Sequence, residues 1–443
     1  GLEIADFDGF FNGYEIAQIG KEFDLLKFTS DCILNIEIKS QAVDTNKIEK
    51  QLRRNEYYLK HINRDLFLYT FISDTKQVYQ WDRNLGLVTS SISNLCAKIK
   101  ELSLTYHEDI SCFFRASDYL ISPLTTPARF LNREYFLTNH QEKIKAEIQV
   151  ILNKTQTKSY FCIRGSAGTG KTLLLYDIAS ELSTHGKCCM IHCGNLCAGH
   201  STINRSNRQL DVVPAKQIKD ADVLSSYDFV FVDEAQRMYD NAFEAVVNHA
   251  LISNATAFFC CDPRQVLSKR EYRRQISDKI SQLPNVHEFE LTDKIRSNQE
   301  LSDFINMLFD QNFQTTRSLV SCVDLLFVET HDYALQALSY LKQKGYKYIH
   351  YTPSQYVDHI IDKVVGDMCT HEAIGQEFDK VVVIIDNNFS YNTDGKLVAR
   401  YHPNPDYLFS KLLFQEVTRV REHLCILFVS NRTIFENVLS RIK

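Results

Sequence analysis

The chain has 443 residues, of which 44% are apolar and 24% charged, and its formal net charge is −5. This composition excludes a disordered chain and a uniformly basic nucleic-acid coat, while a local basic groove stays compatible with it. No apolar run reaches the length of a membrane span, and the first residues lack the order of a signal peptide. We therefore expect a cytoplasmic globular protein of two to three domains.

Residues 1–122 predict a small α/β domain, because strand-like runs flank one helical pattern. The expected elements are strands at residues 14–28, 32–39, 66–71 and 78–81 and helices at residues 46–62 and 92–104. Residues 123–129 contain two prolines among small polar residues, which predicts a linker. The linker separates this domain from a longer second part of the chain.

After the linker, continuous apolar strands alternate with helical patterns, for example "YFCIRG", "CCMIHC", "FVFVDE", "KVVVIID" and "HLCILFV". Such an alternation is typical of parallel sheets that are buried on both faces. The number of strands predicts two such domains in tandem, at residues 130–288 and 289–443. The fold class is therefore α/β throughout.

A phosphate-binding loop follows the first strand of the second part. The sequence "GSAGTGKT" matches G-x-x-x-x-G-K-[ST], lies directly after an apolar strand and opens a helical pattern. Glycines let backbone N–H groups approach phosphates at a helix N-terminus, while the lysine binds β/γ oxygens and the threonine holds Mg²⁺. The predicted ATP-binding residues are Gly165, Ser166, Ala167, Gly168, Thr169, Gly170, Lys171 and Thr172.

Two adjacent carboxylates end a buried strand in "FVFVDEAQ". An acidic pair at the tip of such a strand is placed opposite the phosphate loop. Asp233 can then hold Mg²⁺ with Thr172, and Glu234 can orient or deprotonate the attacking water. The two motifs together predict P-loop ATPase activity.

From residue 130 onward the chain resembles superfamily 1 DNA helicases, and most closely a small bacterial group of the UvrD/RecD-like type. "FLTNHQEKI" looks like the family's Q motif, which implies that Gln141 contacts the adenine. "CCDPRQVLS" is similar to the Gly-Asp-x-x-Gln motif and implies that Gln265 senses the γ-phosphate. The resemblance also implies that both parallel-sheet domains are RecA-like.

Three later motifs extend the resemblance toward the C-terminus. "LTDKIRSN" and "EVTRVREHLCILF" look like the family's arginine motifs and make Arg296 and Arg419 candidate γ-phosphate arginines. "THEAIGQEFDKVVV" resembles the motif that contacts nucleic acid and the sugar, with His371, Gly375 and Glu377 in register. Ile374 stands where many members carry a polar residue, and the chain has no room for the large inserted subdomains of UvrD-like enzymes.

The first domain contains charged residues within strand-like runs, in "EFDLLKFTSDCILNIEIKS". Buried charge is costly unless the charges serve one another or a metal ion. At strand spacing Glu37 and Lys39 share one face, and Asp24 lies near the tip of the neighbouring strand. This pattern resembles that of PD-(D/E)XK nucleases, of restriction-endonuclease-like fold.

The nuclease resemblance implies that Asp24 and Glu37 hold Mg²⁺ or Mn²⁺ and that Lys39 positions or activates the hydrolytic water. Gln51 lies on the following helix, where many members place a glutamine that faces the site. The alternative is an ion pair at a strand edge. We favour the nuclease because domains of this fold often accompany superfamily 1 helicases.

Thirteen cysteines are scattered through apolar strands. The densest group includes Cys188, Cys193, Cys197, His192 and His200 but no C-x-x-C pair, so we favour a buried strand over a zinc site.

The sequence predicts a metal-dependent nuclease fused to an ATP-driven motor that translocates on or unwinds nucleic acid, with DNA favoured over RNA. A role in anti-phage defence or DNA processing is a hypothesis from the resemblance. One alternative is an ATP-switched motor whose first domain is a non-catalytic targeting module, and another is ATP-gated assembly. The sequence leaves open whether the chain forms a homo-oligomer or binds a partner protein.

Overall fold

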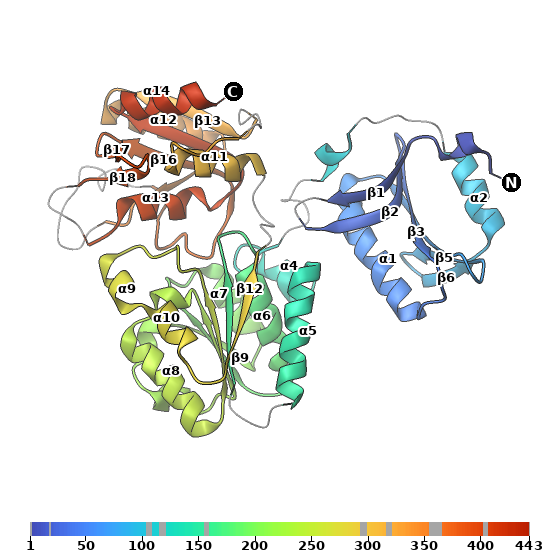
Figure 1. Ribbon diagram of the computed structural model, residues 1–443, viewed down its shortest axis with the longest axis horizontal. Helices are drawn as coiled ribbons and strands as arrows, with labels where there is room; N and C mark the ends of the chain where they lie inside the picture. Colours follow the sequence, from blue (N-terminus) through green and yellow to red (C-terminus); the bar gives the residue numbers. More distant parts are fainter. Residues whose placement is uncertain are drawn as a thin grey trace. The chain divides into compact units, whose positions relative to one another are not determined.

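The computed structural model describes residues 2–16, 19–102, 109–114, 121–154, 159–292, 299–315, 321–353, 366–401 and 406–442 (Figure 1). The chain forms two compact units. The first comprises Gly1–Leu120 with Tyr135–Asn139, and the second comprises Ile121–Glu134 with His140–Lys443.

The first unit is built on one mixed sheet with the strand order β1-β2-β3-β4-β5-β6. Its strands are β1 (Phe10–Ile16), β2 (Lys21–Phe28), β3 (Cys32–Lys39), β4 (Asp65–Ile72), β5 (Gln77–Asp82) and β6 (Gly86–Ser90), and its helices are α1 (Thr45–Leu59) and α2 (Ile92–Glu101). Only β3 and β4 pair in parallel, and α1 makes the crossover between them. The α/β class that the sequence predicts is confirmed, while the restriction-endonuclease-like assignment stays a prediction.

The strand expected at residues 14–28 is in fact two strands, and the first of them starts earlier, at Phe10. β1 and β2 form an antiparallel pair with a turn at Gly20, whose φ is +60°. Glycine adopts this left-handed conformation without steric cost, so the chain reverses there. Apolar and aromatic residues run through both strands, which conceals the reversal in the sequence.

Helix α1 packs on the sheet through one apolar side. Asp44 caps its N-terminus by accepting a hydrogen bond from the Asn46 N–H at 3.0 Å. Ile48, Leu52 and Leu59 are buried along the helix. The polar residues Gln51 and Asn55 lie on the same helix and reach the side chain of Glu37 on β3.

The second unit begins with a six-stranded, all-parallel sheet in the order β12-β7-β11-β10-β8-β9. Its strands are β7 (Tyr160–Gly165), β8 (Cys188–His192), β9 (Leu210–Pro214), β10 (Phe229–Asp233), β11 (Thr256–Cys261) and β12 (Val286–Leu291). Its helices are α4 (Pro127–Leu131), α5 (Asn139–Lys154), α6 (Lys171–Leu182), α7 (Ala198–Ser206), α8 (Asp240–Ser253), α9 (Lys269–Arg274) and α10 (Ile276–Ser281). Figure 1 shows α5 and α6 on one face of the sheet and α8 and α10 on the other. We call this part the first lobe.

Two sequence boundaries differ from the observed elements. The boundary at residues 288/289 falls inside β12, which pairs with β7 along its whole length and so belongs to the first lobe. Residues 123–129 are part of the second unit: Leu124 is buried, and Pro127 opens helix α4. Proline suits the first turn of a helix as well as a linker, which explains the difference.

The second lobe carries a five-stranded parallel sheet in the order β13-β19-β16-β14-β15. Its elements are α11 (Gln299–Phe309), β13 (Val323–Val328), α12 (His331–Gln343), β14 (Lys347–His350), β15 (Met368–Cys369), β16 (Phe378–Asp386), α13 (Phe409–Val417), β19 (Val420–Val429), α14 (Arg432–Arg441) and the hairpin β17 (Phe389–Tyr391) with β18 (Leu397–Ala399). Two parallel sheets with helices around them are consistent with the predicted RecA-like lobes.

Candidate functional site

The phosphate loop connects β7 to α6 at the carboxyl end of the first sheet. Gly168 and Gly170 both have φ of +80°, and a Cβ on Gly165 would lie 2.6 Å from Thr169 Oγ1. The glycines are therefore required by the backbone path. Lys171 Nζ donates a hydrogen bond of 2.9 Å to the Ser166 carbonyl, so the ammonium group already lies over the loop where phosphate oxygens would bind.

Thr172 and Asp233 meet at the start of α6 and the end of β10. Thr172 Oγ1 donates to both carboxylate oxygens of Asp233, at 3.3 and 3.4 Å, and both residues are buried. A hydroxyl and a carboxylate are oxygen ligands of the kind that Mg²⁺ prefers. These two residues fit the role of holding Mg²⁺ beside the phosphate loop.

Glu234 follows Asp233 in a left-handed conformation with φ of +57°. Its Oε2 accepts hydrogen bonds from Gln236 Nε2 at 2.7 Å and from Arg237 Nε at 3.3 Å. Burial acts to raise the pKa of Glu234, but the charges of Arg237, Lys171 and Arg419 outweigh it and lower this pKa to about 2. The carboxylate is therefore ionised and surrounded by cations.

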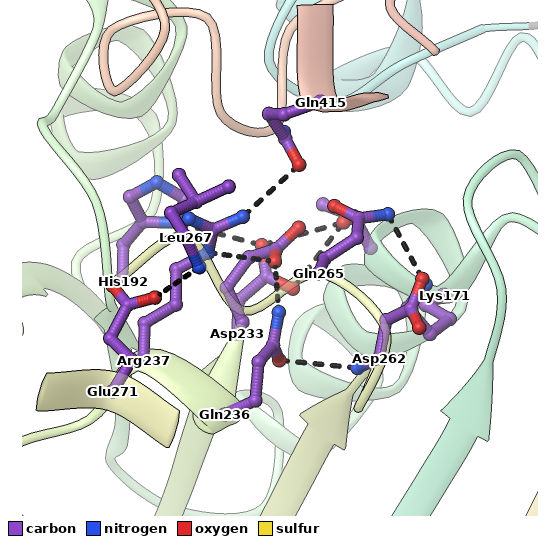
Figure 2. Close-up of polar contacts among 12 residues, drawn as sticks. Lys171, His192, Asp233, Gln236, Arg237, Asp262, Gln265, Leu267, Glu271 and Gln415 are labelled. Carbon is purple, nitrogen blue, oxygen red and sulfur yellow. Dashed lines mark hydrogen bonds and ion pairs between the residues drawn. The ribbon is translucent and has the colours of Figure 1, made fainter. Parts of the chain in front are cut away.

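A chain of side-chain contacts joins Glu234 to Gln265, and Figure 2 labels its members Gln236, Asp262 and Gln265. Gln236 donates to Glu234 and accepts from the Asp262 N–H at 3.1 Å, and Asp262 Oδ2 accepts from Gln265 Nε2 at 3.0 Å. Within the part of the chain that the structure describes, the buried Gln265 Oε1 has no hydrogen-bond partner. That oxygen can accept a hydrogen bond from a water molecule or a phosphate-bound hydroxyl.

Gln141 also contacts the phosphate loop. Its Nε2 lies 3.4 Å from the Thr169 carbonyl and 3.2 Å from the Gly170 carbonyl, and the side chain is buried. Its role as the adenine-contacting residue stays a prediction. In this structure it supports the backbone of the loop.

A cavity of about 430 Å³ lies over the loop and is lined by residues of both lobes. Ser166, Ala167, Gly168 and Asp262 contribute from the first lobe, and Glu377 contributes from the second. The structure thus places Glu377 at the same cavity as the phosphate loop. The volume and the lining suit a nucleotide, which is of the size that such cavities hold.

Of the two candidate arginines, the structure describes only Arg419, because Arg296 falls among residues 293–298, outside the described part. Arg419 is buried after α13, and its Nε donates to the Gln415 carbonyl at 3.3 Å. Its charge contributes to the low pKa of Glu234, which places it near the acidic pair.

The motif with His371 and Gly375 lies at the edge of the second lobe. His371 Nδ1 is 2.6 Å from Thr352 Oγ1, and burial lowers its pKa to about 4, with a smaller contribution from the charge of Arg237. Gly375 has φ of +76°, and a Cβ there would lie 2.8 Å from the side chain of Leu124. His371 is therefore neutral, and Gly375 permits close packing on the first lobe.

In the first unit, the structure brings together the three charged residues of the nuclease-like pattern. Lys39 Nζ lies 4.0 Å from Asp24 Oδ2 and 3.9 Å from Glu37 Oε2. Asp24 Oδ2 also accepts the Ile38 N–H at 2.7 Å, which fixes the carboxylate across the β2–β3 pair. Two carboxylates therefore converge on one cation, the Lys39 ammonium.

Glu37 is the most buried member of this cluster, with 1% of its surface exposed. Its Oε1 accepts from Asn55 Nδ2 at 2.8 Å and from Asn35 Nδ2 at 3.3 Å, and Gln51 Nε2 donates to Oε2. Burial raises the pKa of Glu37, against the opposing charge of Lys21. Amide donors thus replace water around this carboxylate.

Lys21 is a second lysine of the cluster, and sequence reasoning did not find it. Its Nζ lies 4.0 Å from Glu37 Oε1 and 4.3 Å from the centre of the Phe23 ring. Burial lowers the pKa of Lys21 to about 8. The only sequence signal was a lysine at the start of an apolar strand.

The two carboxylates fit a divalent cation in part. Their oxygens already bracket a cation, as an Mg²⁺ or Mn²⁺ site requires. Among the described residues, however, no group of three or more His, Cys, Asp or Glu side chains is arranged to hold a metal ion. Water and phosphate oxygens would have to complete the coordination.

In the cysteine-rich segment of the first lobe, Cys188 lies buried in β8, and Cys197 Sγ lies 3.2 Å from His200 Nδ1.

Sequence reasoning also missed three residues around the phosphate loop and the acidic pair. Gln236, Arg237 and Gln415 connect Glu234 to the neighbouring segments through side-chain hydrogen bonds. Gln236 lies two residues after Glu234, so its closeness to the acidic pair in the chain was a signal. Arg237 and Gln415 gave none, because their contact joins segments that are far apart in the sequence.

Residues 158–349 match the family model described as Schlafen group 3, DNA/RNA helicase domain. The match includes the phosphate loop, the acidic pair and Gln265, and it spans fewer than half of the residues of the chain. No curated protein matches the chain. The match supports a helicase-like domain that interacts with nucleic acid. Among the described helices, none is both long and apolar enough to cross a membrane.

Proposed function

We propose that this chain is an ATP-dependent nuclease-helicase of the superfamily 1 type. The observation that carries the ATPase part is the convergence of Lys171, Thr172, Asp233, Glu234 and Gln265 at one end of a parallel sheet. The helicase-domain match over the same residues supports nucleic acid as the polymer along which the motor moves. DNA as the preferred substrate remains part of the proposal.

In the proposed ATPase reaction, a water oxygen forms a bond to the γ-phosphorus while the bond to the β,γ-bridging oxygen breaks. Glu234 orients the water and takes its proton, and Gln265 Oε1 accepts a hydrogen bond from the same water. Lys171 and Arg419 bind the charge that develops on the phosphate oxygens. Mg²⁺ held by Thr172 and Asp233 would neutralise β- and γ-phosphate charge.

Because Arg419 comes from the second lobe and Lys171 from the first, both can bind the γ-phosphate only when the lobes are closed on ATP. Hydrolysis and phosphate release remove that shared anion. The interaction that stabilises the closed arrangement of the lobes is then lost, so opening and closing follow the nucleotide cycle. Repeated cycles on a bound strand would produce translocation.

For the first unit we propose metal-dependent phosphodiester cleavage. Asp24 and Glu37 would hold Mg²⁺ or Mn²⁺, which supplies charge stabilisation when bound. Lys39, which lies within 4.0 Å of both carboxylates, would position or activate the hydrolytic water. Gln51 would fix Glu37 through the hydrogen bond to Oε2.

One observation favours the second candidate, a non-catalytic targeting module. Both oxygens of Glu37 already accept hydrogen bonds or ion pairs from protein groups, which satisfies the carboxylate without a metal ion. The cluster could then serve as a structural network that binds nucleic acid without cutting it.

Cleavage assays separate these functions. Labelled single- and double-stranded DNA would be incubated with the wild type, Lys39→Ala and Lys171→Ala in Mg²⁺ or Mn²⁺, with and without ATP. The proposal expects that Lys39→Ala loses cleavage and that any effect of ATP is lost in Lys171→Ala. If DNA stimulates ATP hydrolysis but no preparation cuts, the first unit is a targeting module.

We also propose that the activity serves anti-phage defence. In cells challenged with phage, Lys171→Ala and Lys39→Ala should each remove protection. Protection that survives both substitutions would contradict this role.

A further inference from the structure

Arg237 connects the acidic pair to the second lobe. Its side chain is 2% exposed, and its Nε lies 3.3 Å from Glu234 Oε2. From the same guanidinium, Nη2 donates to Gln415 Oε1 on α13 at 3.1 Å, a contact that Figure 2 shows between the two lobes. Among the described residues, the buried Nη1 has no hydrogen-bond partner. Arg237 therefore contacts the carboxylate of Glu234 and helix α13 of the second lobe, and one N–H group of its guanidinium is left for a further acceptor.

Arg237 also lines a second cavity of about 300 Å³, whose lining includes no residue of the phosphate loop. The neutral His371 lines it too, hydrogen-bonded to Thr352. The charged groups that line this cavity are Lys216, Arg237, Arg270 and Arg274 with Glu271 and Asp406. Cations thus outnumber anions.

The two carboxylates of the cavity already have partners. Asp406 Oδ2 lies 3.4 Å from Arg270 Nε, and Glu271 Oε2 accepts the Leu267 N–H at 2.7 Å. A cavity with excess positive charge and a buried, unpartnered guanidinium N–H group favours an anion. Phosphate oxygens suit the planar arginine donors particularly well.

We infer that Arg237 is a positioning residue that couples the binding of a phosphate-bearing anion in this cavity to the arrangement of Glu234. The inference rests on the proposed ATPase function. An anion that accepts hydrogen bonds from Arg237 competes with Glu234 Oε2 for the same guanidinium. When the contact with Glu234 weakens, Oε2 becomes available to the attacking water. ATP hydrolysis is then faster when the cavity is occupied.

Replacement of Glu234 by an anion as the partner of Arg237 also affects the second lobe. Gln415 accepts from Arg237 through its side chain, while its carbonyl accepts from Arg419 Nε. A shift of the Arg237 guanidinium therefore acts on Gln415, whose carbonyl is bonded to Arg419, the candidate γ-phosphate arginine that follows the end of α13. The phosphate group can come from a nucleic-acid backbone or from free phosphate, and both have the chemistry that the cavity recognises.

The test measures kcat and KM for ATP in the full chain, wild type and Arg237→Gln, with oligothymidylate, with inorganic phosphate, or with neither. We expect oligothymidylate to raise the wild-type kcat several-fold and this stimulation to disappear in Arg237→Gln, with little change in KM. Gln415→Met, which removes the acceptor at the other end, should also reduce the stimulation. Stimulation by inorganic phosphate would mean that a single phosphate group suffices.

Arg270→Gln is the matched control, because Arg270 lines the cavity and pairs with Asp406. It should raise the oligothymidylate concentration needed for half-maximal stimulation but leave the maximum unchanged. Circular dichroism and thermal unfolding of each variant would identify loss of fold. If Arg237→Gln is stimulated as strongly as the wild type, or loses kcat equally in all conditions, the coupling is wrong. If the wild type hydrolyses ATP without any stimulation, the proposed motor function fails as well.

Discussion

Glu416 on α13 is a carboxyl group that the proposed mechanism does not use. It is completely buried, and its Oε1 accepts a hydrogen bond of 2.6 Å from Thr370 Oγ1. Burial raises its pKa well above the ordinary value of 4.5, although the Thr370 hydrogen bond acts in the opposite direction. Burial therefore favours the neutral carboxylic acid over the carboxylate at this position.

This protonation gives a prediction for stability. Between pH 4.5 and the raised pKa, the folded state holds a proton that the unfolded state has lost. The contribution of Glu416 to the free energy of unfolding should therefore be greatest below pH 4.5 and should fall as pH rises toward the raised pKa, by up to about 1.4 kcal/mol per pH unit. Glu416→Gln cannot ionise, so it should unfold at higher urea than the wild type at pH 8 and not at pH 4.5.

Urea unfolding at several pH values measures this difference. Glu436→Gln is the control, because Glu436 is an exposed carboxylate on α14. If the wild type and Glu416→Gln show the same dependence on pH, Glu416 is ionised in the fold and the prediction is wrong.

Arg419 gives a second residue-scale prediction. If it binds developing charge on the γ-phosphate, Arg419→Ala should lower kcat for ATP roughly 10³-fold and change KM much less. Steady-state ATPase kinetics measure both constants. Arg432→Ala is the control, because Arg432 pairs with Glu436 on the surface of α14. An unchanged kcat in Arg419→Ala would exclude it from the reaction.

The neighbourhood of Thr172 and Asp233 could be predicted from the sequence, because each lies at a fixed place relative to a strand end. A phosphate loop is eight consecutive residues, and an acidic pair ends its own strand. The contacts of Arg237 with Gln415 and of Lys21 with Glu37 could not be predicted, since each depends on how separate elements pack. A lysine or arginine in the sequence is usually exposed, and only packing shows that these two are buried.

At the scale of elements, the same distinction applies to the strands of the first unit. The range of β3 could be predicted in full, because the strand is apolar and bounded by polar residues. The turn between β1 and β2 could not, because apolar and aromatic residues continue into both strands around it. Correct pairing of β2 with β3 is what brings Asp24 to the backbone of Ile38.

Helix α1 and strand β3 are joined by a buried amide, which leads to a prediction at this scale. Asn55 Nδ2 donates to Glu37 Oε1 at 2.8 Å and lies 2.6 Å from Asn35 Oδ1. Asn55→Leu leaves these acceptors without their donor and should destabilise the first unit by about 1–3 kcal/mol. Urea unfolding measures the change. Asn94→Leu on the exposed side of α2 is the control, and equal stability of the two variants would contradict the prediction.

At the scale of the whole molecule, the two compact units each have a hydrophobic core of their own. Separate cores can unfold in separate transitions, so a single unfolding temperature would not describe the chain. The predicted ATP-binding residues all lie in the second unit, and the nuclease-like cluster lies in the first. Ligands should therefore act on one transition at a time.

We predict that MgADP raises the unfolding temperature of the second unit and leaves that of the first unchanged. A ligand at 100 times its Kd adds about 2.7 kcal/mol to the unit that binds it. Differential scanning calorimetry of the full chain, with and without MgADP, resolves the two transitions. Trp81, the single tryptophan, lies in the first unit and reports its unfolding by fluorescence.

Lys171→Ala provides the control for this measurement, because the variant lacks the ammonium group that binds the β/γ oxygens but keeps both cores. Its second transition should no longer respond to MgADP. If MgADP still stabilises Lys171→Ala, the nucleotide binds at a place other than the phosphate loop. If MgADP shifts both transitions of the wild type equally, the two units unfold as one, and nucleotide binding in the second can control the stability of the nuclease-like cluster in the first.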